Sequence, residues 1–491
     1  MSERKPIPTA TPEAVGIASE HIEAFVRRLN ARKLNLHSVL VIRHGQLAAE
    51  GYWAPFTAAD KHRMYSVSKS FTAIAVGKLI GEGKVSLTDP IVKFFPDKLP
   101  ERVHPYLAGS QVQDLLRMAD AHLTDTYKFT DMDWIDTYFK TPPTHLAGKI
   151  FTYNTSATVT LCAMVERVTG MPFLQYLRPE FDKLGVSEDI WCIQTPCGYS
   201  FGGSGVICTS RDLAKVALMM MNGGRVDGEQ LLPADYVAAA TGYQIDNRLT
   251  NHDFEHQQGY GYQIWRTRHN GFSFYGMGSQ LAVCLPERDL LLVTTGDTQD
   301  QSPDTTEILE AFWEEIYDKL ADEPLPEAPE AQRRLSVLLD SLAIAPVEGA
   351  RQTPAAQRVS GRTYRLDGNP MGIAWARFDF AGGEGSMTYA NQTGEHTLRF
   401  GFGRHIQQAF PETHYSGSRI NTPLGKGYRC HGSAAWADGR ALIIRIAVTD
   451  VYLGTLNINA TFDGDTVTLL MTKTAEAFLN EYQGFASGRA E

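Results

Sequence analysis

The stretch YSVSKSFTAIAVGKLIGEG, residues 65–83, carries the strongest local signal in the sequence. Its apolar residues, among them Phe71 and Ile74, recur at helical spacing and predict a helix that begins near Ser66. Side chains three residues apart lie on the same face of a helix, about one turn from each other. Ser66 and Lys69 are therefore expected to be neighbours at the start of this helix.

A serine with a lysine one helical turn away can perform nucleophilic chemistry. A serine hydroxyl is a weak nucleophile until a neighbouring group removes its proton, and a lysine kept neutral by burial or by other cations can do this. The N–H of Ser66, at a helix N-terminus, can also stabilise a developing oxyanion. Taken alone, Ser-x-x-Lys equally describes a serine N-cap followed by a solvated lysine.

Two further stretches accompany this pair in a fixed order. FTYNTSATVTLCAMVERVTGMPF covers residues 151–173, and YSFGGSGVICTSRDLAKVALMMMNGG covers residues 199–224. Together with residues 65–97, they resemble the conserved elements of class C β-lactamases, DD-peptidases and related esterases. The resemblance extends over about residues 10–320 and implies an acyl-enzyme mechanism, with Tyr153 as the catalytic tyrosine.

Tyr153 also makes chemical sense in this role. A nearby lysine charge is expected to lower the phenol pKa, so that Tyr153 could pass protons between Ser66, the leaving group and water. The family pattern places an asparagine two residues after the tyrosine, whereas this chain has Asn154 one place early and Thr155 at that position. Either could hydrogen-bond Lys69 or a substrate amide, and the sequence leaves this open.

The third element of the family, Lys-Thr-Gly or His-x-Gly on an inner strand, is eroded. The best register in residues 271–289 is Phe274-Tyr275-Gly276, which keeps only the glycine and makes the N–H of Met277 the second oxyanion donor. The missing cation disfavours β-lactams and peptides that present a carboxylate. Three residues of the preceding segment are candidates to replace this cation: Arg266, Arg268 and His269. Exposed charges at the end of a strand would describe them equally well.

Other candidate groups carry weaker signals. His122 lies in a stretch similar to a pocket-lining segment of the family, and is expected either to line the pocket or to be a packed or solvent-facing histidine. A polar cluster could suggest a metal site but is interpreted as a solvated loop: His252, Asp253, Glu255 and His256. Cys192 and Cys197 have no second pair to complete a zinc site. We expect no metal and no organic cofactor.

The order of strand and helix patterns predicts an α+β fold with an antiparallel sheet and a helical insert. A Pro- and Glu-rich segment, DEPLPEAPEA, follows, and the domain boundary is placed there. The predicted organisation is a hydrolase domain over 1–325, a linker with a short helix over 326–357, and an all-β barrel over 358–491. The last part consists of short alternating strands with Gly, Asp and Asn turns and resembles the lipocalin-like appendages of some family members.

The composition limits the partners. With 491 residues, 43% hydrophobic content and a net charge of −10, the chain has the profile of a globular protein without a basic surface for nucleic acid. No apolar run long enough for a membrane span or secretory signal is found, so a cytoplasmic protein is expected. The expected partner is a small-molecule or peptide substrate, and the pattern leaves room for a homo-oligomer.

These observations predict a serine hydrolase that acts through Ser66 on a small ester, amide or modified peptide. One alternative is an acyltransferase that passes the acyl group from Ser66 to an amine or alcohol. A second alternative is a binding protein that has kept the fold and lost turnover, which the eroded third element would favour and the intact Ser66, Lys69 and Tyr153 oppose.

Overall fold

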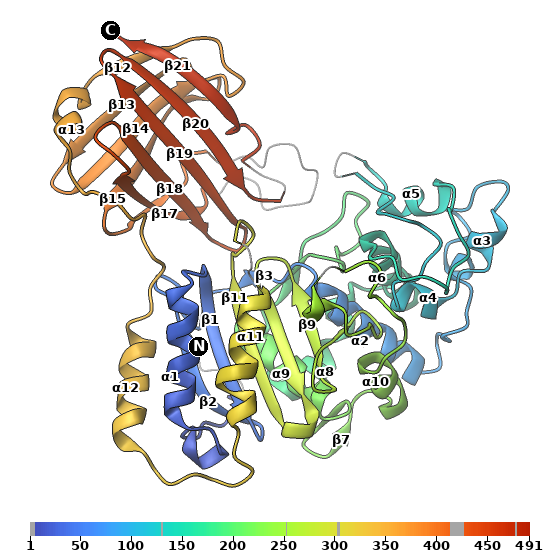
Figure 1. The fold of residues 1–491 in the computed structure, drawn as a ribbon. Helices are drawn as coiled ribbons and strands as arrows, with labels where there is room; N and C mark the ends of the chain where they lie inside the picture. The colour runs from blue at the N-terminus through green and yellow to red at the C-terminus, as the bar shows by residue number, and fades with distance from the viewer. Residues whose placement is uncertain (1–4, 129–130, 252, 302–304, 413–426, 477–478) are drawn as a thin grey trace. The chain divides into compact units, whose positions relative to one another are not determined.

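The computed structural model describes residues 5–128, 131–251, 253–301, 305–412, 427–476 and 479–491 (Figure 1). The chain divides into two compact units, of which the first ends at Ala343 and the second begins at Ile344. Each unit buries its own hydrophobic residues.

An antiparallel sheet forms the centre of the first unit, in the strand order β2-β1-β11-β10-β9-β8. These strands are β1 (Leu36–Arg43), β2 (Gln46–Tyr52), β8 (Trp265–Arg266), β9 (Phe272–Gly276), β10 (Gln280–Leu285) and β11 (Leu290–Gly296). Val39 of β1 pairs with Thr294 of β11, so the sheet joins two distant parts of the sequence. The helical segments between β2 and β8 are the predicted insert, and the α+β class is confirmed.

Helices cover both faces of this sheet (Figure 1). On one face, α1 (Ser19–Ala31) packs against α11 (Thr305–Glu315), with the rings of Phe25 and Phe312 6.1 Å apart. On the other face, α9 (Ser210–Met221) contacts β10 and β11, and α2 (Val67–Gly81) contacts β9. Both faces of the strands are therefore shielded from water, which explains the nearly continuous burial of β10 and β11.

The helix α2 is buried on all sides. Twelve of its fifteen residues are buried, including Lys69, because β9, α6 (Thr155–Thr169) and α10 (Ala234–Thr241) all pack against it. A helix in such a position cannot have a solvated polar face. Its polar side chains must therefore find partners inside the protein.

The remaining elements of the first unit are short. The helices are α3 (Pro105–Ala108), α4 (Val112–Leu116), α5 (Trp134–Lys140), α7 (Phe173–Tyr176), α8 (Arg178–Leu184) and α12 (Pro329–Asp340). The strands are β3 (His62–Arg63), β4 (Trp191–Cys192), β5 (Val206–Cys208), β6 (Arg225–Val226) and β7 (Glu229–Gln230). The 3-10 turns are η1 (Glu13–Val15), η2 (Ile91–Phe94), η3 (Phe254–His256), η4 (Pro286–Arg288) and η5 (Tyr317–Lys319).

The helix α12 belongs to the first unit. It packs on α1, where Arg334 donates a hydrogen bond of 2.9 Å to Glu20. Its apolar residues Ala331 and Leu335 are buried. The first unit thus continues past residue 325, where the sequence pattern changes, because this helix has an apolar stripe that α1 covers.

The second unit is a barrel that carries one short helix, α13 (Pro354–Val359). Its strands are β12 (Thr363–Leu366), β13 (Trp375–Ala381), β14 (Glu384–Asn391), β15 (Gly394–Phe402), β16 (Ile406–Ala409), β17 (Arg429–Trp436), β18 (Ala441–Thr449), β19 (Leu453–Asp463), β20 (Thr466–Thr474) and β21 (Gly484–Ala490). The antiparallel order closes on itself because β15 and β17 also pair in parallel, at Gly401–Ser433 and Phe402–Ala434. The predicted all-β barrel is confirmed.

The cysteines are free thiols, including Cys192 and Cys197. Within the described residues, no group of His, Cys, Asp and Glu side chains is arranged to hold a metal ion. No helix in those same residues is long and apolar enough to cross a membrane.

Candidate active site

Ser66 stands at a strained corner between β3 and α2. It is the N-cap of α2, and the residue before it, Tyr65, has φ of 45°. Tyr65 is 2% exposed, and the guanidinium of Arg63 lies 4.5 Å from the centre of its ring. A bulky residue with positive φ is uncommon, and such conformations concentrate at functional sites. The surrounding packing holds this corner and fixes the direction of the Ser66 side chain.

Lys69 lies one turn along α2 and reaches back to Ser66. Its Nζ donates to Ser66 Oγ over 3.0 Å and to the carbonyl oxygen of Gly203 over 2.7 Å. Lys69 is 1% exposed. The structure therefore brings together the two side chains that the sequence placed on one helical face, and excludes a solvated lysine.

The glycine-rich loop at 202–203 supplies the second contact of Lys69. A Cβ at Gly203 would lie 2.5 Å from Thr155 Cγ2, and a Cβ at Gly202 would lie 2.4 Å from Thr72 Oγ1. Only residues without a side chain allow the loop to approach α2 and α6 this closely. This loop, part of the family-like stretch 199–224, thus lies beside Lys69.

Tyr153 lies next to the Ser66–Lys69 pair. Its ring centre is 5.0 Å from Lys69 Nζ. Burial of the phenol raises its pKa above the ordinary value, and a hydrogen bond with Ser66 acts in the opposite direction but is weaker. The predicted lowering of this pKa is wrong, because desolvation outweighs favourable contacts even though the residue is 37% exposed. Tyr153 is therefore protonated at neutral pH and is suited to donate a proton.

Asn154 has a structural role rather than a contact with Lys69. Its side-chain oxygen accepts from Ser156 N over 2.9 Å and caps α6, and its amide nitrogen donates to the Asp120 carboxylate over 3.0 Å. The residue is completely buried. The expectation that Asn154 serves Lys69 or the substrate is corrected for this reason. Thr155 instead begins α6 and faces the Gly203 loop.

Gly276 ends β9 against the start of α2. A Cβ at this position would lie 2.3 Å from the Met64 carbonyl oxygen and 3.2 Å from Val67 N. The next residue, Met277, thus lies beside the turn that carries Ser66. The role of the Met277 N–H as the second oxyanion donor stays a prediction.

Phe274 does not open onto the site. It is completely buried and pairs with Ala282 in the sheet, while Tyr275 is only partly buried. A lysine at 274 would be a buried charge, which is costly without a partner. A lysine placed at position 274 would therefore not supply the missing substrate-binding cation.

Substitution Gly276→Ala should lower kcat at least about 10-fold, because the added Cβ forces β9 away from α2 and displaces the proposed oxyanion donor. The measurement is steady-state turnover of an aryl ester. Gly109→Ala is the matched control, since its Cβ would meet nothing closer than 3.4 Å. Equal activity in the two variants would show that the close approach at Gly276 is not needed for catalysis.

His122 packs inside the protein. It is 2% exposed, and its ring lies edge-on to Tyr138 with the centroids 4.8 Å apart. Burial lowers the His122 pKa to about 4. Burial likewise raises the pKa of the neighbouring Asp120 to about 7. Of the alternatives for His122, this geometry favours the packed one.

The three candidate replacements for the missing cation are engaged elsewhere. Arg266 donates to the carbonyl oxygen of Thr241 and to Asn270. Arg268 forms an ion pair with Glu255, and His269 stacks on Tyr317 with the centroids 3.8 Å apart. All three side chains contact groups other than Ser66, so none of them is assigned to substrate binding.

The segment around 252–256 is not a solvated loop in its described part. Residues 254–256 form η3, and Glu255 is 4% exposed. Glu255 accepts from the indole N–H of Trp313 over 3.1 Å and pairs with Arg268. His256 packs on aromatic rings and bonds Asp253. The solvated interpretation is corrected for these residues; His252 lies outside the described residues.

Gln263 is a buried support that the sequence did not reveal. Its carbonyl oxygen accepts from Ser70 over 2.9 Å, and its side-chain oxygen accepts from Thr158 over 2.6 Å. Its amide nitrogen donates to the Leu115 carbonyl oxygen over 2.7 Å. Gln263 thus ties α2, α6 and α4 together. No local pattern could have identified it, because every partner is distant in sequence.

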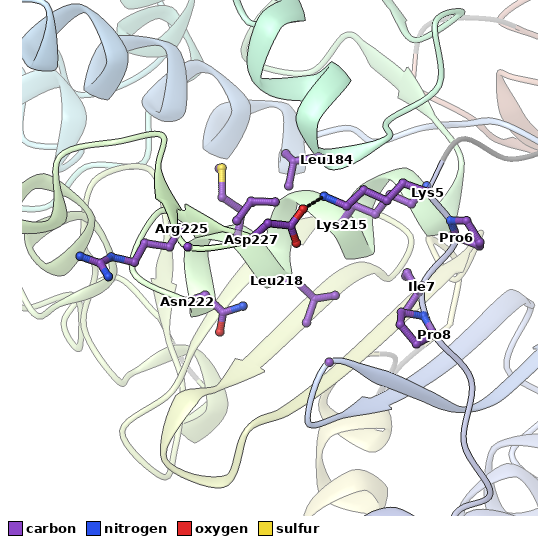
Figure 2. A pocket seen from close by; sticks show the side chains of 14 residues that line it. Lys5, Pro6, Ile7, Pro8, Leu184, Lys215, Leu218, Asn222, Arg225 and Asp227 are labelled. Atoms are coloured by element: carbon purple, nitrogen blue, oxygen red, sulfur yellow. Dashed lines mark hydrogen bonds and ion pairs between the residues drawn. The ribbon is translucent and has the colours of Figure 1, made fainter.

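A separate cavity of about 520 Å³ lies away from these residues (Figure 2). It is lined by residues 5–8, by α8 and α9, and by the β6–β7 hairpin, and Lys5 forms an ion pair with Asp227 at its edge. Its lining shares no residue with the surroundings of Ser66. The cavity is therefore not the candidate site.

Comparison with known proteins identifies the family of this chain. The family model described as Beta-lactamase matches residues 22–311. The 6-aminohexanoate-dimer hydrolase of Paenarthrobacter ureafaciens is 30% identical over 289 residues, which are 54% of this chain and 73% of that protein.

Two solved structures share the fold. A Bacillus anthracis protein provisionally named 6-aminohexanoate-dimer hydrolase has a TM-score of 0.53 at 17% identity, covering 66% of this chain and 90% of its own. A penicillin-binding-protein homologue from Caulobacter crescentus has a TM-score of 0.50 at 17% identity, covering 62% and 99%. With a family model matched over more than half of its length, this chain belongs to the beta-lactamase family of hydrolases.

Proposed function

We propose that this chain is a serine hydrolase that forms an acyl-enzyme on Ser66. The observation that carries the proposal is the 3.0 Å hydrogen bond from Lys69 Nζ to Ser66 Oγ at a strained helix N-terminus. An activated nucleophile is recognised by such a contact with a base that other groups orient in turn. Here the Gly203 carbonyl oxygen orients Lys69.

In the proposed acylation step, Ser66 Oγ attacks the substrate carbonyl while Lys69, in its neutral amine form, takes the hydroxyl proton. Charge on the carbonyl oxygen is stabilised by the N–H groups of Ser66 and Met277. Tyr153, protonated at neutral pH, gives its proton to the leaving group. Lys69 then returns a proton to Tyr153, and water releases the acyl group in the second step.

The proposed substrates are small esters, amides or modified peptides. The Paenarthrobacter relative is named as a hydrolase of a 6-aminohexanoate dimer, which supports an amide among them. Phe274 occupies the place of a family cation and is buried, and Arg266 and Arg268 bind other groups. A substrate that needs a cation for its carboxylate is therefore disfavoured.

Short-chain aryl esters should be hydrolysed with a kcat/KM at least about 10²-fold higher than that of penicillins or cephalosporins. Losing a charge-assisted hydrogen bond to the β-lactam carboxylate costs about 1.5–3 kcal/mol, or roughly 10-fold to 150-fold. The measurement compares both substrate classes with one enzyme preparation titrated for active Ser66. Efficient penicillin turnover would contradict the substrate class and leave the Ser66 mechanism in place.

A further inference from the structure

A row of aromatic rings leads away from the reaction centre. Trp265 lies 5.5 Å from the ring of Tyr153 at 30°, and Tyr275 lies 6.0 Å from Trp265 at 85°. His256 lies 4.9 Å from Tyr275. We call these four side chains, Tyr153, Trp265, Tyr275 and His256, the aromatic wall.

The wall begins at the catalytic groups. Tyr153 contacts Lys69 and Ser66, and Tyr275 directly precedes Gly276, which packs on the turn that carries Ser66. The wall therefore runs from Tyr153, beside the place where a scissile carbonyl would be attacked, through Trp265 and Tyr275 to His256. A substrate group next to that carbonyl would meet the wall.

A second layer of residues holds the wall in place. Trp265 is 9% exposed and packs edge-on to Tyr260 at 5.1 Å, and Tyr260 in turn contacts Phe151 at 5.1 Å. Met118 belongs to the same buried cluster. His256 donates a hydrogen bond of 2.6 Å to Asp253, which orients its ring. Rings that are already ordered lose little entropy when they bind a ligand.

The charges near the wall favour a ligand without negative charge. At the Tyr153 end, Lys69 binds Ser66 and Gly203. On the strand segment of Trp265, Arg266 and Arg268 bind Thr241, Asn270 and Glu255. The acidic side chains near the wall include Asp253, which His256 holds, and Asp125, whose charge acts on Tyr153. A carboxylate pressed against these rings would lose its hydration without gaining a partner. A hydrocarbon chain would gain from burial and dispersion.

We propose that the aromatic wall binds the acyl chain of the substrate and selects uncharged hydrocarbon chains over chains that end in a carboxylate. This inference rests on the proposed function of Ser66, and it specifies the acyl donor. Tyr275 and His256 are specificity-determining residues in this proposal, because they extend the wall beyond the groups that handle protons.

The test uses p-nitrophenyl esters with one leaving group and different acyl chains. From acetate to hexanoate, kcat/KM should rise by about 3-fold for each methylene that the wall covers, and at least about 10-fold in total. The glutarate monoester should react at least about 10-fold more slowly than pentanoate, which has a chain of the same length without the charge. Rates are corrected for the intrinsic reactivity of each ester towards hydroxide.

Tyr275→Ala should lower kcat/KM for hexanoate at least about 10-fold and for acetate less than about 3-fold, since only the longer chain reaches this ring. His256→Ala should likewise lower the ratio of kcat/KM for hexanoate to kcat/KM for acetate. This variant tests the inference if Tyr275→Ala does not fold. Tyr106→Ala is the matched control: Tyr106 has the same 37% exposure as Tyr153, lies on α3, and packs on His104. It should leave the ratio unchanged.

Labelling of Ser66 by a fluorophosphonate is measured on the same samples to separate two kinds of failure. If Ser66 is labelled but acyl-chain length and charge make no difference, the wall inference is overturned and the serine hydrolase remains. If Tyr275→Ala and His256→Ala slow acetate and hexanoate equally, the wall only shapes the site and the inference is also overturned. If Ser66 is not labelled, the proposed function itself fails, and the inference fails with it.

Discussion

Replacing Ser66 by alanine is expected to abolish both the hydrolysis of aryl esters and labelling of the protein by a fluorophosphonate. The wild type should be labelled once, at Ser66, because an activated serine beside oxyanion donors attacks such electrophiles. We expect kcat to fall at least about 10⁴-fold, the scale on which loss of a nucleophile acts when it removes the whole catalytic unit. Intact-mass measurement and peptide mapping check the labelling.

Ser68→Ala is the matched control for this experiment. Ser68 is in the same helix and fully buried, and its hydroxyl accepts a hydrogen bond of 2.9 Å from Val206 N. Its loss should cost about 1 kcal/mol of stability while labelling at Ser66 persists. A Ser66→Ala protein that is still labelled at full stoichiometry would show that the nucleophile lies elsewhere.

Lys69→Met and Tyr153→Phe are each expected to lower kcat at least about 10²-fold with the fold intact, the usual scale for a positioned proton-transfer group. Methionine fills much of the volume of the buried lysine, and phenylalanine keeps the ring against Trp265 while removing the hydroxyl. Steady-state kinetics and thermal unfolding of both variants are the measurements. Thermal unfolding distinguishes a lost proton-transfer group from a damaged core.

The reduction in kcat of the double variant should be much smaller than the product of the two single reductions, because the effects of members of one catalytic unit are not additive. Burial places the Tyr153 pKa above its ordinary value, so the hydroxyl keeps its proton through neutral pH. If kcat/KM falls as the pH rises through neutrality, the ionisation of a group other than Tyr153 therefore causes the fall. Full activity in Tyr153→Phe would move the proton donor to a different group.

The local features of the site could be predicted from sequence. Ser66 and Lys69 are three residues apart in one helix, so helical geometry alone makes them neighbours. The barrel strands could also be predicted from sequence, because alternation of apolar and polar residues between turn residues is a property of each short segment. A short helix was also expected after the Pro- and Glu-rich segment, where α12 lies.

The roles of several side chains were decided only by tertiary packing. Asn154 caps α6 and binds Asp120 instead of serving Lys69, and Phe274 faces the core rather than the substrate. Glu255 is buried against Trp313, although its own segment is polar. In each case the partner lies far away in the sequence, so no local pattern contains it.

The sequence by itself determined the family elements, their order and the pairing of Ser66 with Lys69. Tertiary structure decided the pKa direction of Tyr153, the support of Lys69 by the Gly203 carbonyl, and the aromatic wall. The physical reason is that desolvation and ring packing depend on every atom around a group. Those atoms come from segments that meet only when the sheet brings β9 against the start of α2.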